Sequence, residues 1–250
     1  MTVSFVVPVV IVFLAGILTG VTGFGFSVLS VPLLLLVFQP HEVVVIALCL
    51  VPITSVVLLL APGLRGQVRQ RTFGALTAFS VVGLPVGILL FEHFDPMWVT
   101  GLMGLVLLAY AVYGLVGTGT VALRGHWVAP SGILGGILAT STGLSGPAVA
   151  MYVHGRRVST REQTATMSAY VGAISVLGLG LLAVRGAVSE DDLQQVARLA
   201  GGAVAGTLLG RWWASKRHDT LDRVILVALG SMGVWTVGRS VMWLTRGTWG

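Results

Sequence analysis

The chain has 250 residues, of which 55% are hydrophobic and only 10% are charged. Because a soluble domain carries about 25% charged residues, this composition excludes an ordinary soluble protein and predicts an integral membrane protein. The formal charge of +6 does not indicate nucleic-acid binding, since the basic residues lie in short segments between apolar runs and form no reader motif. The single cysteine, Cys49, excludes an intrachain disulfide.

The first apolar run, residues 3–38, is too long for one ordinary membrane helix, and its glycines cluster in the stretch 16–27. A weaker copy of that stretch returns about 120 residues later. Five pairs match at that offset: Gly16 with Gly136, Ile17 with Ile137, Leu18 with Leu138, Thr22 with Thr142, and Gly23 with Gly143. Interrupted hydrophobic segments at corresponding places in two halves point to the binding site of a transporter.

Six further apolar runs are long enough to cross the hydrocarbon, for which about twenty residues suffice. They are 43–60, 73–91, 97–116, 164–184, 193–213 and 221–244. A glycine-rich linker at 118–127, expected in the cytoplasm, separates a first repeat, 1–117, from a second repeat, 128–250.

The basic residues predict which ends of these spans face the cytoplasm. Eleven of the fifteen Lys and Arg residues fall in four regions. These are Arg65, Arg69 and Arg71; Arg124; Arg156, Arg157 and Arg161; and Arg211, Lys216, Arg217 and Arg223. Because positively charged loops face the cytoplasm, we expect all four regions on that side.

The apolar run 128–153 lies between two of these basic regions, so it must enter the membrane and return to the same side. We therefore expect a hairpin of two half-length helices with its tip at 142–147. Its repeat partner, the first run, is expected to form a second hairpin with its tip near 22–25. The alternative is a single long tilted helix in which the glycines serve close packing.

Each repeat would then consist of one broken-helix hairpin and three transmembrane helices, an odd number of crossings that places the repeats in opposite orientations. The predicted fold class is an all-α integral membrane protein with two inverted repeats, an arrangement found in many secondary transporters. Gly83-x-x-x-Gly87 and Gly202-x-x-x-Gly206 correspond between the repeats at an offset of 119, and their spacing predicts helix contacts.

A hairpin tip inside the membrane leaves backbone groups without helical partners, which is tolerated only where the tip is buried in protein or lines a cavity. The half-helix that begins there presents unpaired N–H groups and the positive end of its dipole. Two such ends form a pocket for an anion without a buried arginine. Candidate substrate-binding residues lie in both tips: Thr22, Gly23, Phe24, Gly25, Ser27, Ser141, Thr142, Gly143, Ser145 and Gly146. The alternative is that these residues only allow close helix packing.

Three titratable residues near the hairpins are candidates for ion coupling. Glu42 and Glu162 correspond at an offset of 120, and each opens a span, where a carboxylate is usually a cap or dipole partner; proton coupling is the second interpretation. His154 is either a titrating group or an interfacial residue beside Arg156. No phosphate-binding, zinc-binding or nucleophile motif appears, so we expect no enzyme activity, no cofactor and no metal.

Residues 16–25, followed by Val31-Pro32-Leu33-Leu34, resemble the opening motif of the sulfite exporter TauE/SafE family of permeases, and residues 135–147 resemble its second copy. The resemblance covers essentially the whole chain. It implies a multi-pass permease of the bacterial plasma membrane for sulfur-containing anions such as sulfite and organosulfonates, with an anion site near the two motifs. The chain departs from the family pattern at Phe26, where a small residue is common, and after Leu144, where a glycine is missing.

These features together predict a secondary transporter whose partners are a small anion, bound at the midplane, and the lipid bilayer of the cell membrane. Export is favoured over uptake, because each exported negative charge gains about 2.3 kcal/mol per 100 mV when the inside is negative. The alternatives are a proton-coupled anion uptake permease and a membrane scaffold subunit that transports nothing.

Overall fold

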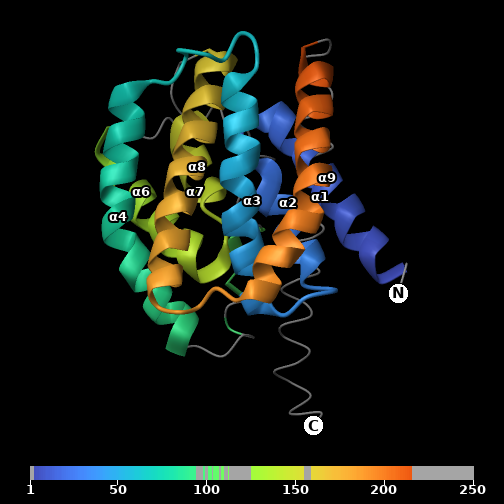
Figure 1. Cartoon of the computed structure of the whole chain (residues 1–250). Helices are drawn as coiled ribbons and strands as arrows, with labels where there is room; N and C mark the ends of the chain where they lie inside the picture. Colours follow the sequence, from blue (N-terminus) through green and yellow to red (C-terminus); the bar gives the residue numbers. More distant parts are fainter. Residues whose placement is uncertain are drawn as a thin grey trace.

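The computed structural model describes residues 3–93, 98, 101–102, 104–106, 108–109, 112, 125–154 and 159–215. In these ranges the chain forms helices joined by short turns, and no strand occurs among them (Figure 1). Several sequence predictions fall wholly or mostly outside the described residues: the spans 97–116 and 221–244, the linker 118–127, and the basic residues Arg124, Arg156, Arg157, Lys216, Arg217 and Arg223.

Four long helices form the frame of the bundle: α3 (Pro40–Leu60), α4 (Gln70–His93), α8 (Thr160–Val184) and α9 (Glu190–Ala214). Within the described residues, α3, α4 and α8 are long and apolar enough to cross a membrane, in agreement with three of the predicted spans. Helix α9 covers the predicted span 193–213 but is not among these three, because Gln194, Gln195 and Arg198 lower its hydropathy.

Both glycine-rich runs are broken helices, as predicted. In the first, α1 (Val3–Thr22) is followed after two residues by α2 (Gly25–Leu34). In the second, the short 3-10 helix η1 (Gly125–Trp127) leads into α6 (Val128–Thr142), and α7 (Gly146–His154) begins after three intervening residues. Gly23 and Gly143 at the two breaks have φ angles of 89° and 73°, a left-handed conformation that glycine adopts without steric cost. The first run is therefore not one continuous helix.

Each break reverses the direction of the chain, so both runs form hairpins. In Figure 1, α3 and α9 rise from the lower to the upper end of the bundle, whereas α4 and α8 descend. Gly23 lies against Thr164 near the upper start of α8, and α3 begins at the lower end, so α2 runs back down. Gly143 lies against Val44 near the lower start of α3, and α8 begins at the upper end, so α7 runs back up.

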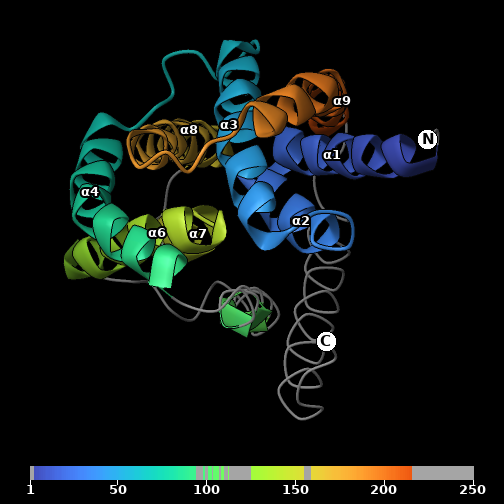
Figure 2. The same ribbon diagram turned by 60° about the horizontal axis from the view of Figure 1, so that its bottom comes forward.

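The first helix of each hairpin packs lengthwise on a long helix from the other half of the sequence, α1 on α9 and α6 on α4 (Figure 2). Glycines bring the backbones together at both contacts. A Cβ atom at Gly206 would collide with the carbonyl oxygen of Phe13, and one at Gly83 would collide with the carbonyl oxygen of Ile133. Small residues at such positions let membrane helices approach closely.

The register of these contacts corrects one sequence prediction. Gly83 and Gly206 contact residues that are themselves 120 positions apart, Phe13 and Ile133, yet the two glycines are 123 positions apart. The predicted correspondence at an offset of 119 is therefore wrong by one helical turn. It went wrong because α9 has glycines at 202, 206 and 210, so the four-residue spacing alone fits two registers.

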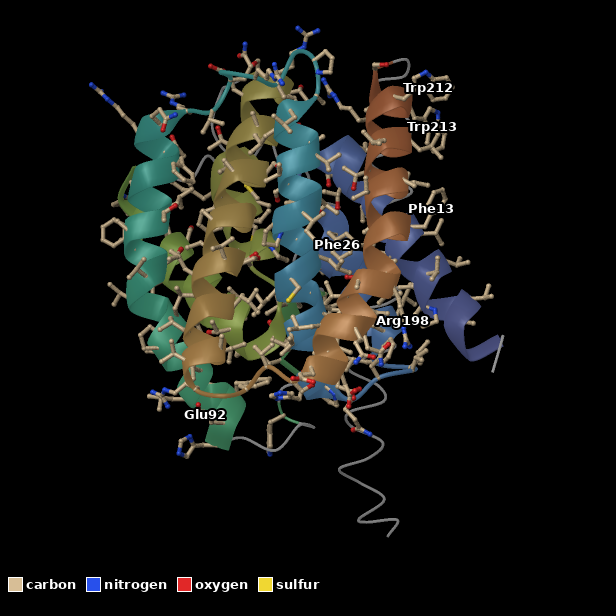
Figure 3. All side chains as sticks on the ribbon, viewed as in Figure 1. Phe13, Phe26, Glu92, Arg198, Trp212 and Trp213 are labelled. Carbon is tan, nitrogen blue, oxygen red and sulfur yellow. The ribbon has the colours of Figure 1, made fainter. Side chains whose placement is uncertain are left out.

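The outer surface of the bundle is apolar, and its charges lie at the two ends. Large exposed apolar side chains such as Val82 and Val176 cover the outside. The described basic residues of the predicted cytoplasmic regions lie at the upper end: Arg65, Arg69, Arg71, Arg161 and Arg211. At the lower end an ion pair of 3.1 Å joins Arg185 to Glu92 (Figure 3). The described basic residues therefore share one end of the bundle, as the expectation that their regions all face the cytoplasm requires.

Candidate functional site

The two helix breaks meet inside the bundle. The ring of Phe24, from the first break, lies directly on Gly146, where a Cβ atom would be only 2.6 Å from it. Each break also packs against a long helix of the other half: Gly23 contacts Thr164 of α8, and Gly143 contacts Val44 of α3. The structure therefore brings the two predicted tips together.

A threonine stabilises each break by the same local hydrogen bonds. The Thr22 hydroxyl donates to the carbonyl oxygen of Leu18 at 2.9 Å and accepts from the N–H of Gly25 at 3.1 Å. The Thr142 hydroxyl donates to the carbonyl oxygen of Leu138 at 2.7 Å and accepts from the N–H of Leu144 at 3.3 Å. Both hydroxyl protons are therefore already used within the chain.

Three serines were also predicted to contact a ligand, and their hydroxyls differ in their hydrogen-bond partners. Ser141 donates to the carbonyl oxygen of Ile137 at 2.7 Å. Ser27 and Ser145 are only 3% and 2% exposed, and in the part of the chain that the structure describes no hydrogen bond involves either hydroxyl. Neither hydroxyl is therefore committed to a backbone carbonyl, which is also true of the buried hydroxyls of Ser30 and Ser55.

The start of a helix lies beside each of these serines. Ser27 is in the first turn of α2, whose N-cap residue, Phe24, makes no side-chain capping bond. Ser145 immediately precedes α7, and Pro147 lies in the first turn of that helix, where its missing N–H removes nothing from the helix. The first-turn N–H groups and the positive ends of both dipoles favour an anion.

The phenylalanines make one side of this region apolar. Phe26 is buried within the bundle (Figure 3), and the ring of Phe24 covers Gly146. Phe26 therefore places a large aromatic side chain next to Ser27 in the chain.

The three predicted coupling residues do not lie together. The Glu42 carboxylate accepts a hydrogen bond from the N–H of Gln39 at 2.9 Å, and the Glu162 carboxylate accepts one from the N–H of Ser159 at 3.2 Å. Both belong to capping boxes at opposite ends of the bundle. His154 ends α7. Within the described residues, no group of three His, Cys, Asp or Glu side chains could hold a metal ion.

The structure adds a hydrogen-bonded clamp on the second hairpin that the sequence did not predict. The Ser80 hydroxyl of α4 lies 2.7 Å from the Tyr170 hydroxyl of α8 and 2.7 Å from the carbonyl oxygen of Gly132 in α6. Thr140 of α6 donates to the carbonyl oxygen of Leu84 in α4 at 2.9 Å. Among the described residues of α1 and α9, no hydrogen bond joins the two helices.

Comparison with known proteins identifies one family. A family model described as sulfite exporter TauE/SafE matches residues 9–236 of the chain. Neither a curated protein nor a solved structure gives a significant match. The matched residues include both helix breaks and all four long helices.

Proposed function

Since this chain belongs to the sulfite exporter TauE/SafE family, it is a membrane transporter of the sulfite or anion type and not an enzyme, and we propose that it binds its substrate where the two helix breaks meet. The observation that carries this proposal is the pair of buried serines, Ser27 and Ser145, whose hydroxyls have no partner in the described chain. Both lie beside the start of a short helix at the junction of the two breaks.

The proposed ligand is a small oxyanion, sulfite or an organosulfonate. Its oxygen atoms would accept hydrogen bonds from the two serine hydroxyls and from first-turn N–H groups of α2 and α7, which suit negative charge. The missing side chains of Gly25 and Gly146 leave room for Leu18 and Phe24 to pack against the breaks, while Thr22 and Thr142 would hold the breaks in shape. The rings of Phe24 and Phe26 would contact the organic part of a sulfonate.

We propose that the two halves, 1–117 and 128–250, are inverted repeats. Several contacts support this. Helices α3 and α8 run in opposite directions, as do α4 and α9. Gly23 contacts Thr164, and Gly143 contacts Val44. The two glycines are 120 positions apart, and so are Val44 and Thr164. Two half-helix ends related in this way are typical of substrate sites in secondary transporters.

Export across the cell membrane is the proposed direction. With the inside negative, each exported negative charge gains about 2.3 kcal/mol per 100 mV, so export needs no coupled ion. The carboxylates of Glu42 and Glu162 are occupied as helix caps, which weakens the case for them as proton carriers. Proton-coupled uptake remains the alternative within the same class, and a scaffold that transports nothing is the alternative from another class.

Flux into and out of liposomes at a clamped voltage tests direction and class together. We expect sulfite or an organosulfonate to leave liposomes whose interior is negative, without any ion gradient. The rate of efflux should rise as the interior is made more negative. Uptake driven by a proton gradient would contradict export and support the proton-coupled uptake alternative. A purified protein that neither binds nor moves sulfite, thiosulfate, sulfonates or carboxylates would be a scaffold instead.

A further inference from the structure

An open groove of about 650 Å³ lies between the upper ends of α3 and α9, and no residue of the two helix breaks lines it. Its wall is apolar along most of its length and is formed by Val57 and Leu60 of α3 and by Val204 and Leu208 of α9. Leu60 and Leu208 are 56% and 53% exposed. An apolar hollow on the outer side of a membrane protein faces lipid chains rather than water.

The upper end of the groove carries a positive charge that no described carboxylate balances. Arg211 lines the groove there, and its guanidinium donates to the carbonyl oxygen of Pro62 at 3.3 Å. Among the described residues the only ion pair joins Arg185 to Glu92, so Arg211 has no carboxylate partner among them. This end of the groove therefore favours an anion.

Aromatic side chains place the groove at the level of the membrane surface. Trp212 lines it, and both Trp212 and Trp213 are exposed near the upper end of α9 (Figure 3). Tryptophan is enriched where the hydrocarbon meets the headgroups. The charged end of the groove is thus at headgroup depth, and its apolar wall runs below it along the hydrocarbon.

We propose that this groove binds an anionic phospholipid of the leaflet at the basic end of the bundle. The phosphate pairs with Arg211, because guanidinium groups bind phosphate oxygens in a fixed geometry. One acyl chain lies along Leu60 and Leu208. Basic pockets between membrane helices on the cytoplasmic side bind anionic headgroups, and a free phosphate would leave the apolar wall unused. Such a lipid would bridge α3 and α9, which come from different halves of the chain.

Native mass spectrometry of protein purified with equal amounts of dioleoylphosphatidylglycerol and dioleoylphosphatidylcholine tests the site. We expect wild-type protein to retain the anionic lipid, Arg211→Gln to lower its retention about tenfold, and Arg211→Lys to restore part of it. Leu208→Trp, which fills the groove, should lower retention of both lipids. Arg71→Gln, at the same end but outside the groove, and Leu193→Trp, exposed on the lower part of α9, should change neither.

Equal retention of the anionic lipid by wild type and Arg211→Gln would overturn the proposal. It would also be overturned if Arg71→Gln and Leu193→Trp lost as much lipid as Arg211→Gln and Leu208→Trp. The other occupant to be tested is the chain's own segment 221–244. In a Cys49→Ala background, efficient disulfide formation between Leu60→Cys and single cysteines placed along that segment would show that this segment fills the groove and would also overturn it. A folding failure of Leu208→Trp leaves the arginine pair of variants as the decisive measurement.

Discussion

The two hairpins have breaks of the same kind but are held in the bundle by different contacts. In each, a glycine in the left-handed region and a threonine cap end the first helix. Among the described residues, the first hairpin packs closely on α9 without a hydrogen bond between α1 and α9. The second hairpin is hydrogen-bonded to α4 through Ser80 and Thr140, and Ser80 in turn contacts Tyr170 of α8. The shape of a break is therefore set locally, while its attachment depends on the partner helix.

This difference predicts unequal mobility. Close packing without hydrogen bonds resists separation of two helices but fixes their rotation and sliding less strongly than directional bonds do. We therefore expect amide exchange to be faster in α1 and α2 than in α6 and α7. If the two hairpins alternate in exposing a central site, the first is the one with fewer bonds to break.

The largest expected effect comes from the glycine contacts that both hairpins share. Gly206→Ala and Gly83→Ala each drive a Cβ atom into a facing backbone carbonyl, and we expect each to lower the free energy of unfolding by about 3 kcal/mol. Gly201→Ala and Gly180→Ala, which face open space, should instead stabilise by up to about 1 kcal/mol. Denaturant unfolding in detergent measures all four; equal stability of the two sets would contradict the shared packing.

The clamp on the second hairpin gives the next effect. Tyr170→Phe removes the hydroxyl that contacts Ser80, and we expect a loss of about 1 kcal/mol together with faster amide exchange in α6, approaching that of α1. Ser175→Ala, also buried on α8, is the matched control and should leave α6 unchanged. Unaltered exchange in Tyr170→Phe would mean that the clamp does not distinguish the hairpins.

The threonine caps should be equivalent. Thr22→Val and Thr142→Val remove the hydroxyl that caps each break and keep its volume, and each should cost about 1 kcal/mol. Thr22→Ser and Thr142→Ser keep the hydroxyl and should cost less. Thermal unfolding of the four variants checks this, and a strongly unequal pair of valine variants would argue that the two breaks are not the same structure.

The smallest expected effect concerns the ion pair that joins α4 to α8. Its partners at the lower end of the bundle are Arg185, whose side chain is 55% exposed, and Glu92, whose side chain is 29% exposed. We expect Arg185→Gln to change the free energy of unfolding by no more than about 0.5 kcal/mol, because exposed pairs are weak and are screened by salt. A larger loss that persists in high salt would show that this contact, rather than the clamp, holds α8 to α4.

The sequence predicted the breaks because glycine clusters in the middle of long, repeated apolar runs are typical of interrupted membrane helices, and it predicted the charged ends from the arginines. It could not assign the hydroxyls. Whether Thr22 or Ser27 is free for a ligand depends on which backbone carbonyl each side chain reaches, and this is not visible in composition. The contact between Ser80 and Tyr170 joins residues 90 positions apart without any charge or motif to indicate it, and repeated glycines in α9 left the helix register ambiguous.

Isothermal titration of sulfite and a small organosulfonate into purified protein tests the proposed site most directly. The wild type should bind, Ser27→Ala and Ser145→Ala should each weaken binding about tenfold, since a hydrogen bond to a charged ligand is lost, and the double variant should weaken it further. Ser175→Ala should bind as the wild type does. Undiminished anion binding by a folded Ser27→Ala/Ser145→Ala double variant would contradict a substrate site at the meeting of the two breaks.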